Sequence, residues 1–428
     1  MTVTFVAVAA FARSGVERYA AVQLRLSAGF INRWTVGLLK AAGIAALVMV
    51  LLAGFVGTRD PNHSIAPTLV WIAWWVGFSY LAMLVGNVWP VVNPWLTLHE
   101  LFASPAGRAA RPWPQRLGAW PSVAALLAFG WFELVFPFRA SPPVLGWLAL
   151  AYSAVTWAGM ARYGARAWLE HADPFHRAFE LFSRFAPFAL LPDGKLVVRP
   201  YAARLLESRP VPSAHVAFIM AMLAIVLFDG FQASAHWVAI EDAVHAIDPQ
   251  LGDAAWIALH SAGLLAMWLV FLGLYLAACR LAKAASGAAL TTLDYARAFA
   301  PTLIPIAVGY HFAHTFGYLI VQGQSLVLLV SDPFGLGWNL FGTAGAEVNE
   351  AVIATKTAWY LALGAIVVGH AISVWLAHAA AERLLAGRGR VLGVLTPITV
   401  LMVLYTVISL QILAEPLVRY SGPQETII

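Results

Sequence analysis

The stretch that decides the fold is residues 41–57, AAGIAALVMVLLAGFVG, which contains no charged side chain. A stretch of this kind has the length that an α-helix needs to cross the hydrocarbon core of a bilayer, about 17 to 25 residues. Similar stretches recur along the chain, and 61% of all residues are hydrophobic. Because hydrocarbon offers no partner to unpaired backbone groups, segments of this length are typical of transmembrane helices. The sequence therefore predicts an all-α integral membrane protein.

We expect residues 1–428 to form a single polytopic helical bundle. A partial helix at residues 1–12 precedes the complete spans, because this apolar run is too short to cross the membrane. It predicts either the inner half of a first helix, which requires apolar residues upstream, or a short interfacial helix. The basic residues follow this run, which is the reverse of the order in a signal peptide. The nine complete spans are predicted at residues 41–57, 65–92, 118–137, 143–161, 213–232, 255–279, 298–320, 352–380 and 391–413.

Positive charges are concentrated on one side of the predicted bundle. When alternate connections are assigned to the cytoplasm, 22 of the 26 Lys and Arg residues fall on that side. This asymmetry follows the positive-inside rule, so the net charge of +5 indicates topology and not a nucleic-acid-binding surface. The C-terminus is then expected outside. The four exceptions are Arg59, Arg139, Lys356 and Arg419.

Three connections are long enough to have structure of their own. Residues 162–212, on the cytoplasmic side, place Phe175, Phe179 and Phe182 at helical spacing. This spacing predicts an amphipathic helix on the membrane surface, and a plain basic connector is the alternative. The outer loop 233–254 is acidic, and the outer loop 331–350 combines glycines with aromatic residues, which suggests a lid over the outer mouth.

Ionisable side chains inside the spans are the candidates for function, because each is costly in a membrane and is usually kept for a task. Glu133, Asp229 and His260 lie near the outer ends of their predicted helices. His311 and His314 lie in the outer half of the span at 298–320. All five therefore have similar depth, and they can form one site if their helices are neighbours.

The two histidines of the 298–320 span are three residues apart, which places both imidazoles on one helical face. His311, His314 and Asp229 can together bind a divalent or transition metal ion, with Glu133 or His260 as a further ligand or general base. Other interpretations remain open. The histidines can hydrogen-bond to a carbonyl or a tyrosine, transfer protons, or bind haem together with His370.

The string SDPFGLGW, at residues 331–338 in the predicted outer loop, is the longest of several short strings between residues 40 and 385 that resemble the bacterial membrane family named fenitrothion hydrolase. The other strings are Asp60-Pro61-Asn62 with Ala66-Pro67, Trp74-Trp75-Val76-Gly77, Gly86-Asn87-Val88-Trp89, Asn93-Pro94-Trp95, Asp173-Pro174-Phe175, Phe228-Asp229-Gly230-Phe231, Gln322-Gly323-Gln324, Gly369-His370 and Ala377-His378.

The resemblance implies a multi-pass protein of the bacterial inner membrane that hydrolyses an aryl organophosphorus ester. Such a reaction needs a water made nucleophilic near neutral pH and a positive centre for the developing charge, and one bound metal ion supplies both. A small apolar substrate would reach the site from the lipid or through the outer loops. The rival interpretations are a proton- or ion-coupled transporter or channel, in which the same buried groups form a pathway, and a haem-binding redox protein.

Overall fold

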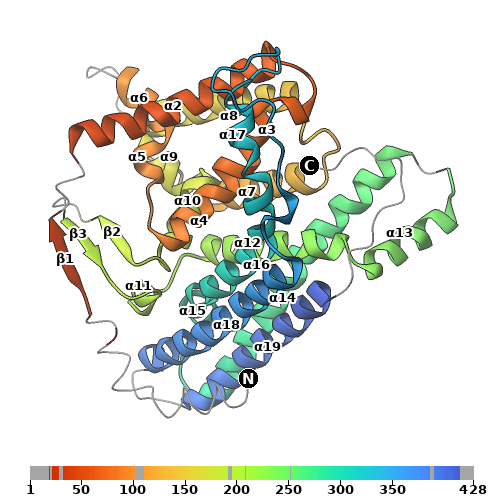
Figure 1. Cartoon of the computed structure of the whole chain (residues 1–428). Helices are drawn as coiled ribbons and strands as arrows, with labels where there is room; N and C mark the ends of the chain where they lie inside the picture. Colours follow the sequence, from red (N-terminus) through yellow and green to blue (C-terminus); the bar gives the residue numbers. More distant parts are fainter. Residues whose placement is uncertain are drawn as a thin grey trace.

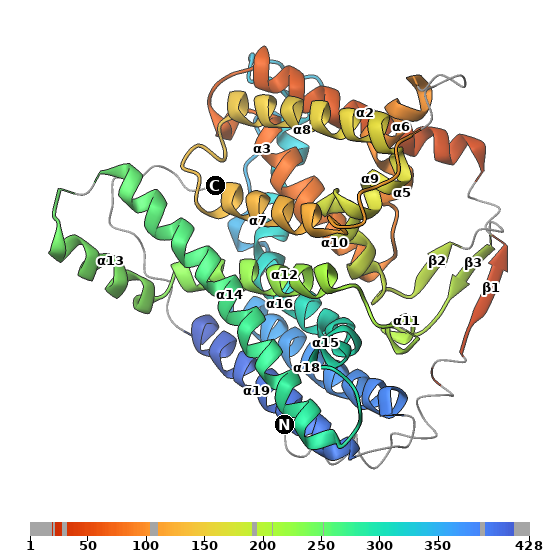
Figure 2. The same cartoon turned by 180° about the vertical axis from the view of Figure 1, so that it is seen from behind.

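The structure is a computed structural model that describes residues 19, 22–27, 32–102, 110–190, 195–207, 209–250, 252–385 and 390–414. About 75% of the chain is helical. Two groups of helices pack against a central pair, as Figures 1 and 2 show from opposite sides. One group contains α2 and α8, the other contains α14, α18 and α19, and α12 and α16 lie between them.

Within the described residues, eight helical segments are long and apolar enough to cross a membrane. This confirms the predicted all-α class and gives eight candidate membrane spans, while α7 (Trp120–Leu134), predicted as a ninth span, is apolar but shorter. The eight segments are α2 (Arg33–Phe55), α3 to α4 (Ile65–Leu84), α8 (Pro142–Tyr163), α12 (Ser213–Gln232), α14 (Asp253–Ser286), α15 to α17 (Thr292–Leu329), α18 (Thr355–Leu385) and α19 (Val391–Ala414).

Two of these segments are composite. The second consists of α3 (Ile65–Pro67), the π-helix η2 (Thr68–Gly77) and α4 (Phe78–Leu84). The sixth consists of α15 (Thr292–Phe299), the 3₁₀ turn η3 (Ala300–Leu303), α16 (Ile304–Gln322) and α17 (Ser325–Leu329). The remaining helices are η1 (Pro61–His63), α5 (Trp89–Val92), α6 (Pro94–Phe102), α9 (Ala165–His171), α10 (Pro174–Ser183), α11 (Ala203–Leu206), α13 (Ala235–Ile247) and η4 (Glu350–Val352).

Helix boundaries follow local sequence signals. The first long helix begins at Arg33 because the Asn32 side chain caps it, accepting hydrogen bonds from the backbone N–H groups of Trp34 and Thr35. The predicted start at residue 41 was therefore eight residues late, and Lys40 lies inside the helix. Helix α15 begins with a capping box formed by Thr291 and Asp294.

Glycine residues bring α16 and α18 into close contact. A Cβ atom added at Gly309 of α16 would lie 2.7 Å from the carbonyl oxygen of Ala365 in α18. One added at Gly369 of α18 would lie 2.4 Å from the carbonyl oxygen of Pro305. Glycine therefore lets these two backbones touch, which is a common mode of helix packing in membranes.

The 162–212 segment differs from the prediction. Its aromatic helix is α10, but Phe175, Phe179 and Phe182 are buried against η2, α4 and α7 and do not face a membrane surface. An aromatic stripe at helical spacing fits a protein core as well as a lipid surface, and here the protein covers it. The segment also contains strands, which the sequence did not predict.

A small antiparallel sheet is formed by β1 (Leu24–Ser27), β3 (Lys195–Val198) and β2 (Phe188–Leu190), in that order. Leu24 pairs with Val198, and Phe188 pairs with the same residue from the other side. The sheet lies beside α11 at one side of the bundle, while α13 lies at the opposite side (Figures 1 and 2). The predicted partial helix at residues 1–12 lies outside the described residues, as does the C-terminal end of the chain.

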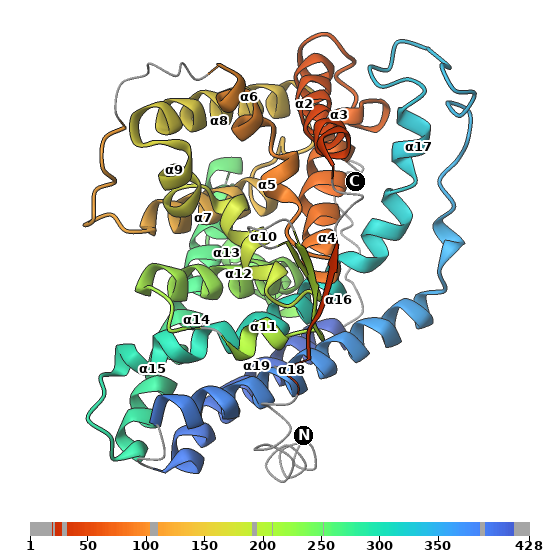
Figure 3. The same ribbon diagram turned by 90° about the vertical axis from the view of Figure 1, so that its left-hand side faces the viewer.

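The loop at 331–350, predicted on the outer side, is irregular and runs beside α17 before it reaches α18 (Figure 3). Asp332 organises it by accepting hydrogen bonds from the backbone N–H groups of Leu336 and Gly337. The carbonyl oxygen of Phe334 accepts a hydrogen bond from the N–H of Thr58, and that of Pro333 accepts one from Ile65. The loop is thereby fixed to the connection between α2 and α3.

Candidate functional site

The strongest polar contact between the central helices joins His314 of α16 to Asp229 of α12. His314 Nε2 lies 2.5 Å from Asp229 Oδ2. Gly230, the next residue of α12, lies beside this pair, since a Cβ atom there would lie 3.8 Å from His314 Cε1, an ordinary van der Waals contact. The two side chains are 35% and 42% exposed, so the protein does not fully cover them.

Glu133, near the end of α7, belongs to the same cluster. Its carboxylate accepts a hydrogen bond from the Trp75 side chain of η2. Its charge also interacts with those of Asp229 and His314. Three residues predicted from depth alone, on three different helices, are therefore brought together in the structure.

Two further residues complete the cluster, and sequence reasoning did not place them in a site. Arg139, in the turn after α7, interacts electrostatically with Glu133 and Asp229. Its backbone carbonyl accepts a hydrogen bond from the Trp71 indole N–H at 3.1 Å, which holds the turn against η2. Tyr318, one helical turn beyond His314, interacts with the same two acids and with Arg139. We call Glu133, Asp229, His314, Tyr318 and Arg139 the ionisable cluster.

The signals for these two residues were present in the sequence. Arg139 is one of the four basic residues that break the charge asymmetry, and a single arginine at the end of an apolar helix needs an acidic partner. Tyr318 follows His314 at i+4, so both side chains lie on one helical face.

His311 lies outside the hydrogen bonds of this cluster. It is 3% exposed, and its ring packs against those of Trp75, Tyr80 and Phe182, with ring centroids 5.5 to 6.2 Å away. Its Nε2 atom has no hydrogen-bond partner among the described residues. Although His311 and His314 share a helical face, the structure gives the two imidazoles different surroundings.

His260 belongs to a separate polar group. Its Nε2 lies 3.2 Å from Oε1 of Glu241 in α13, and Nδ1 lies 3.0 Å from the carbonyl oxygen of Trp256. The Trp237 indole N–H donates to the same Glu241 oxygen at 2.9 Å. The structure thus pairs this histidine, predicted as a catalytic residue, with Glu241 of α13 and not with Asp229.

The packing of α16 against α18 concerns the predicted alternative in which a histidine of α16 binds haem together with His370 of α18. His370 of α18 is 1% exposed and packs on Tyr310, and its Nδ1 lies 2.7 Å from the carbonyl oxygen of Ile366. His311 lies on a different face of α16, towards η2. Because Gly309 and Gly369 hold the two backbones in contact, no space for a porphyrin separates these helices.

The donor set of the ionisable cluster suits a divalent cation, since imidazole and carboxylate groups are common ligands of zinc and related metals. As it stands, no group of three His, Cys, Asp or Glu side chains in the described part of the chain has metal-binding geometry. The direct contact between His314 and Asp229 occupies the two atoms that such an ion would need.

Comparison of the chain with protein-family models, with curated proteins and with solved structures found no match.

Proposed function

We propose that the chain is a multi-pass protein of the bacterial inner membrane, with nine spans, and that it hydrolyses a small apolar ester at the ionisable cluster. The observation that carries the proposal is the contact between His314 and Asp229 with Glu133 and Arg139 beside it. Charged groups of both signs converge in an apolar bundle and remain partly exposed. Charged groups are costly in a membrane, and those that are retained there usually have a function.

Asp229, His314 and Glu133 are the proposed ligands of a divalent cation, with Glu133 in place of the predicted His311. When bound, such an ion supplies a water that loses a proton near neutral pH and a positive centre for developing charge. The resemblance to fenitrothion hydrolases supports an aryl organophosphorus ester as the substrate class. Hydrolysis forms a bond from the water oxygen to phosphorus and breaks the bond from phosphorus to the aryl oxygen, giving a phosphate diester and a phenol.

The remaining residues of the cluster have complementary roles in this proposal. Arg139 is the permanent positive charge and would stabilise the oxygen on which negative charge develops. Tyr318, on the same helical face as His314, would donate a proton to the departing aryl oxygen. Trp75 orients Glu133 through its hydrogen bond.

A second candidate function is proton transfer across the membrane. The observation that favours it is the unpartnered Nε2 of His311, which lies one turn from His314 towards the other end of α16. In this function a proton would pass between Asp229 and His314 through their hydrogen bond and then along α16 to Nε2 of His311.

One experiment separates the two functions. The purified protein in liposomes is assayed for release of p-nitrophenol from diethyl p-nitrophenyl phosphate, and in parallel for decay of an imposed pH gradient. Hydrolysis that stops with a chelator and returns with a divalent metal supports the enzyme. Gradient decay with no hydrolysis under any metal would replace it with the proton pathway.

A further inference from the structure

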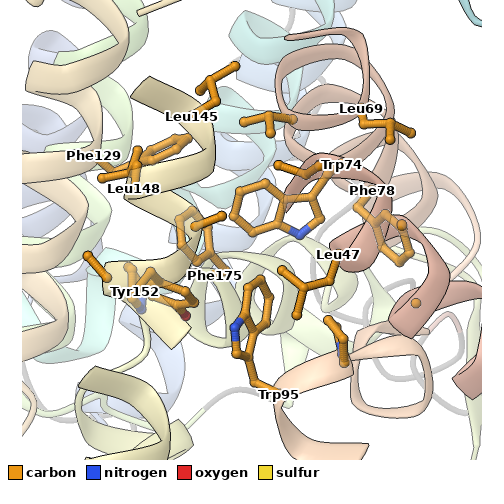
Figure 4. A pocket seen from close by; sticks show the side chains of 18 of the residues that line it. Leu47, Leu69, Trp74, Phe78, Trp95, Phe129, Leu145, Leu148, Tyr152 and Phe175 are labelled. Atoms are coloured by element: carbon orange, nitrogen blue, oxygen red, sulfur yellow. The ribbon is translucent and has the colours of Figure 1, made fainter. Parts of the chain in front are cut away.

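A cavity of about 440 Å³ lies on the other side of η2 from the ionisable cluster. It is lined by residues of α2, η2, α4, α5, α6, α7, α8 and α10, and Figure 4 shows aromatic rings directed into it from several of these helices. We call it the aromatic pocket. Its aromatic lining includes Trp74, Phe78, Trp89, Trp95, Phe129 and Phe175.

The π-helix separates the pocket from the cluster. Trp74 lines the pocket, while the adjacent Trp75 hydrogen-bonds to Glu133. π-Helical turns are rare and frequently lie at functional sites. Glu133, Asp229 and His314 do not line the pocket, so it is a different site from the one proposed above.

The pocket is open to the membrane side of the bundle. Leu148 and Val155 of α8 line it and are 38% and 59% exposed, on a helix that is long and apolar enough to cross a membrane. Helix α2 packs closely against its neighbours at two places. Gly54 contacts Gly146 of α8, and Gly43 contacts Val92 of α5. Ala46, Leu47 and Val50, which line the pocket, lie between these two contacts.

Hydrogen-bond donors in the pocket are not all used by the protein. The Trp95 indole N–H donates to Ser153 Oγ at 2.7 Å, and the Tyr152 hydroxyl donates to Asp173 Oδ2 at 3.0 Å. In contrast, the Nε1 atoms of Trp74 and Trp89 are buried and have no partner among the described residues. Trp89 is only 2% exposed. In Figure 4 the Trp74 indole lies in the middle of the pocket, with its nitrogen on the side of Leu47 and Phe78.

Buried N–H groups without an acceptor are uncommon in native proteins and call for a partner. Every lining residue of the pocket is uncharged, so an ionic ligand is disfavoured. Aromatic walls favour flat rings, which stack on them or meet them edge to face. The volume lies within the range of small-molecule sites, about 300 to 1,000 Å³.

We propose that the aromatic pocket binds a neutral, planar ring compound dissolved in the bilayer, with a carbonyl oxygen that accepts a hydrogen bond from Trp74. Quinones have this chemistry. The ligand enters from the lipid between α2 and α8, its ring packs among the aromatic side chains, and Trp89 offers a second donor.

The test uses the full chain in nanodiscs and a photoreactive azido-benzoquinone with a short isoprenoid tail. We expect saturable labelling of peptides from α2, η2 or α8, and competition by the unmodified quinone. The variant Trp74→Phe keeps the ring and removes only the donor. It should weaken quinone binding about fivefold to tenfold, the loss expected for one hydrogen bond.

Two controls keep the test decisive. Trp268→Phe removes an indole N–H that donates to the Ala217 carbonyl oxygen outside the pocket, and it should leave quinone affinity unchanged. Without ligand, Trp74→Phe should unfold at the same or a higher temperature than the unmodified protein, because it deletes an unpaired donor.

The proposal is overturned if labelling does not saturate, if Trp74→Phe binds the quinone as tightly as the unmodified chain, or if a photoreactive diacyl phospholipid labels the same peptides and the quinone does not displace it. The Asp229→Asn variant should still bind the quinone, so failure of the hydrolase proposal would leave this result intact.

Discussion

His314 Nε2 lies 2.5 Å from Asp229 Oδ2, and this contact joins the two central helices α16 and α12 through groups that are each partly exposed. The pair is the point at which Glu133 and Arg139 also converge. The contact shows that ionisable residues far apart in the sequence, between positions 133 and 318, come together in the bundle. Their helices are neighbours in the structure.

We predict that His311 and His314 are not equivalent. His311→Phe should keep the metal content and most of the hydrolytic rate, because its imidazole is enclosed by aromatic rings and its Nε2 contacts no other polar group among the described residues. His314→Phe should lose both, since it removes a proposed ligand. Elemental analysis of the purified variants and the p-nitrophenol assay measure the difference. Equal loss in the two variants would restore His311 as a ligand.

Position 309, where α16 contacts α18, should accept only glycine without loss of stability. Gly309→Ala places a Cβ atom 2.7 Å from a backbone oxygen, and overpacking of this kind costs about 1 to 3 kcal/mol. Gly364→Ala is the matched control on α18, because a Cβ atom there meets nothing within 4 Å. The thermal midpoint in detergent should fall for the first variant and stay or rise for the second. A fall of equal size in both would remove the packing explanation.

The charge asymmetry predicts which face of the protein is outside. Cys279, the one cysteine of the sequence, is buried, so introduced cysteines can be labelled selectively. Asp248→Cys in the outer loop should react with an impermeant maleimide in spheroplasts. Arg166→Cys, at a side chain that is 90% exposed, should react only after the membrane is permeabilised. The reverse pattern would invert the proposed topology and move the cluster to the inner half of the bilayer.

Sequence patterns predicted the apolar helices because their signal is local. Residues 41–57 require a membrane or a deep core wherever they lie, and α2 contains them within Arg33–Phe55. The sheet could not be predicted in the same way, because β1 pairs with β3 across more than 150 residues. The aromatic face of α10 was misplaced because its periodicity is the same in a core and at a lipid surface.

The candidate site was only partly predictable. Depth along the helices grouped Glu133, Asp229 and His314, but it grouped His260 with them as well, because depth carries no information on which helices are neighbours. The structure places His260 beside Glu241. The π-helix was not predictable, since Trp71, Trp74 and Trp75 lie in a segment that is apolar on every side. Within it, Trp74 lines the aromatic pocket and Trp75 hydrogen-bonds to Glu133.

The measurement that tests the central claim most directly is the rate of diethyl p-nitrophenyl phosphate hydrolysis by Asp229→Asn, with His260→Gln as the control. Asparagine keeps the size of the side chain and removes its charge, so the ionisable cluster loses a ligand while the fold is preserved. We predict a fall of about 10²-fold or more for Asp229→Asn, because the cation that would activate the water and stabilise developing charge loses a ligand, and no fall for His260→Gln. Hydrolysis by Asp229→Asn at the unmodified rate, or its absence from the metal-supplied unmodified protein, would contradict the account.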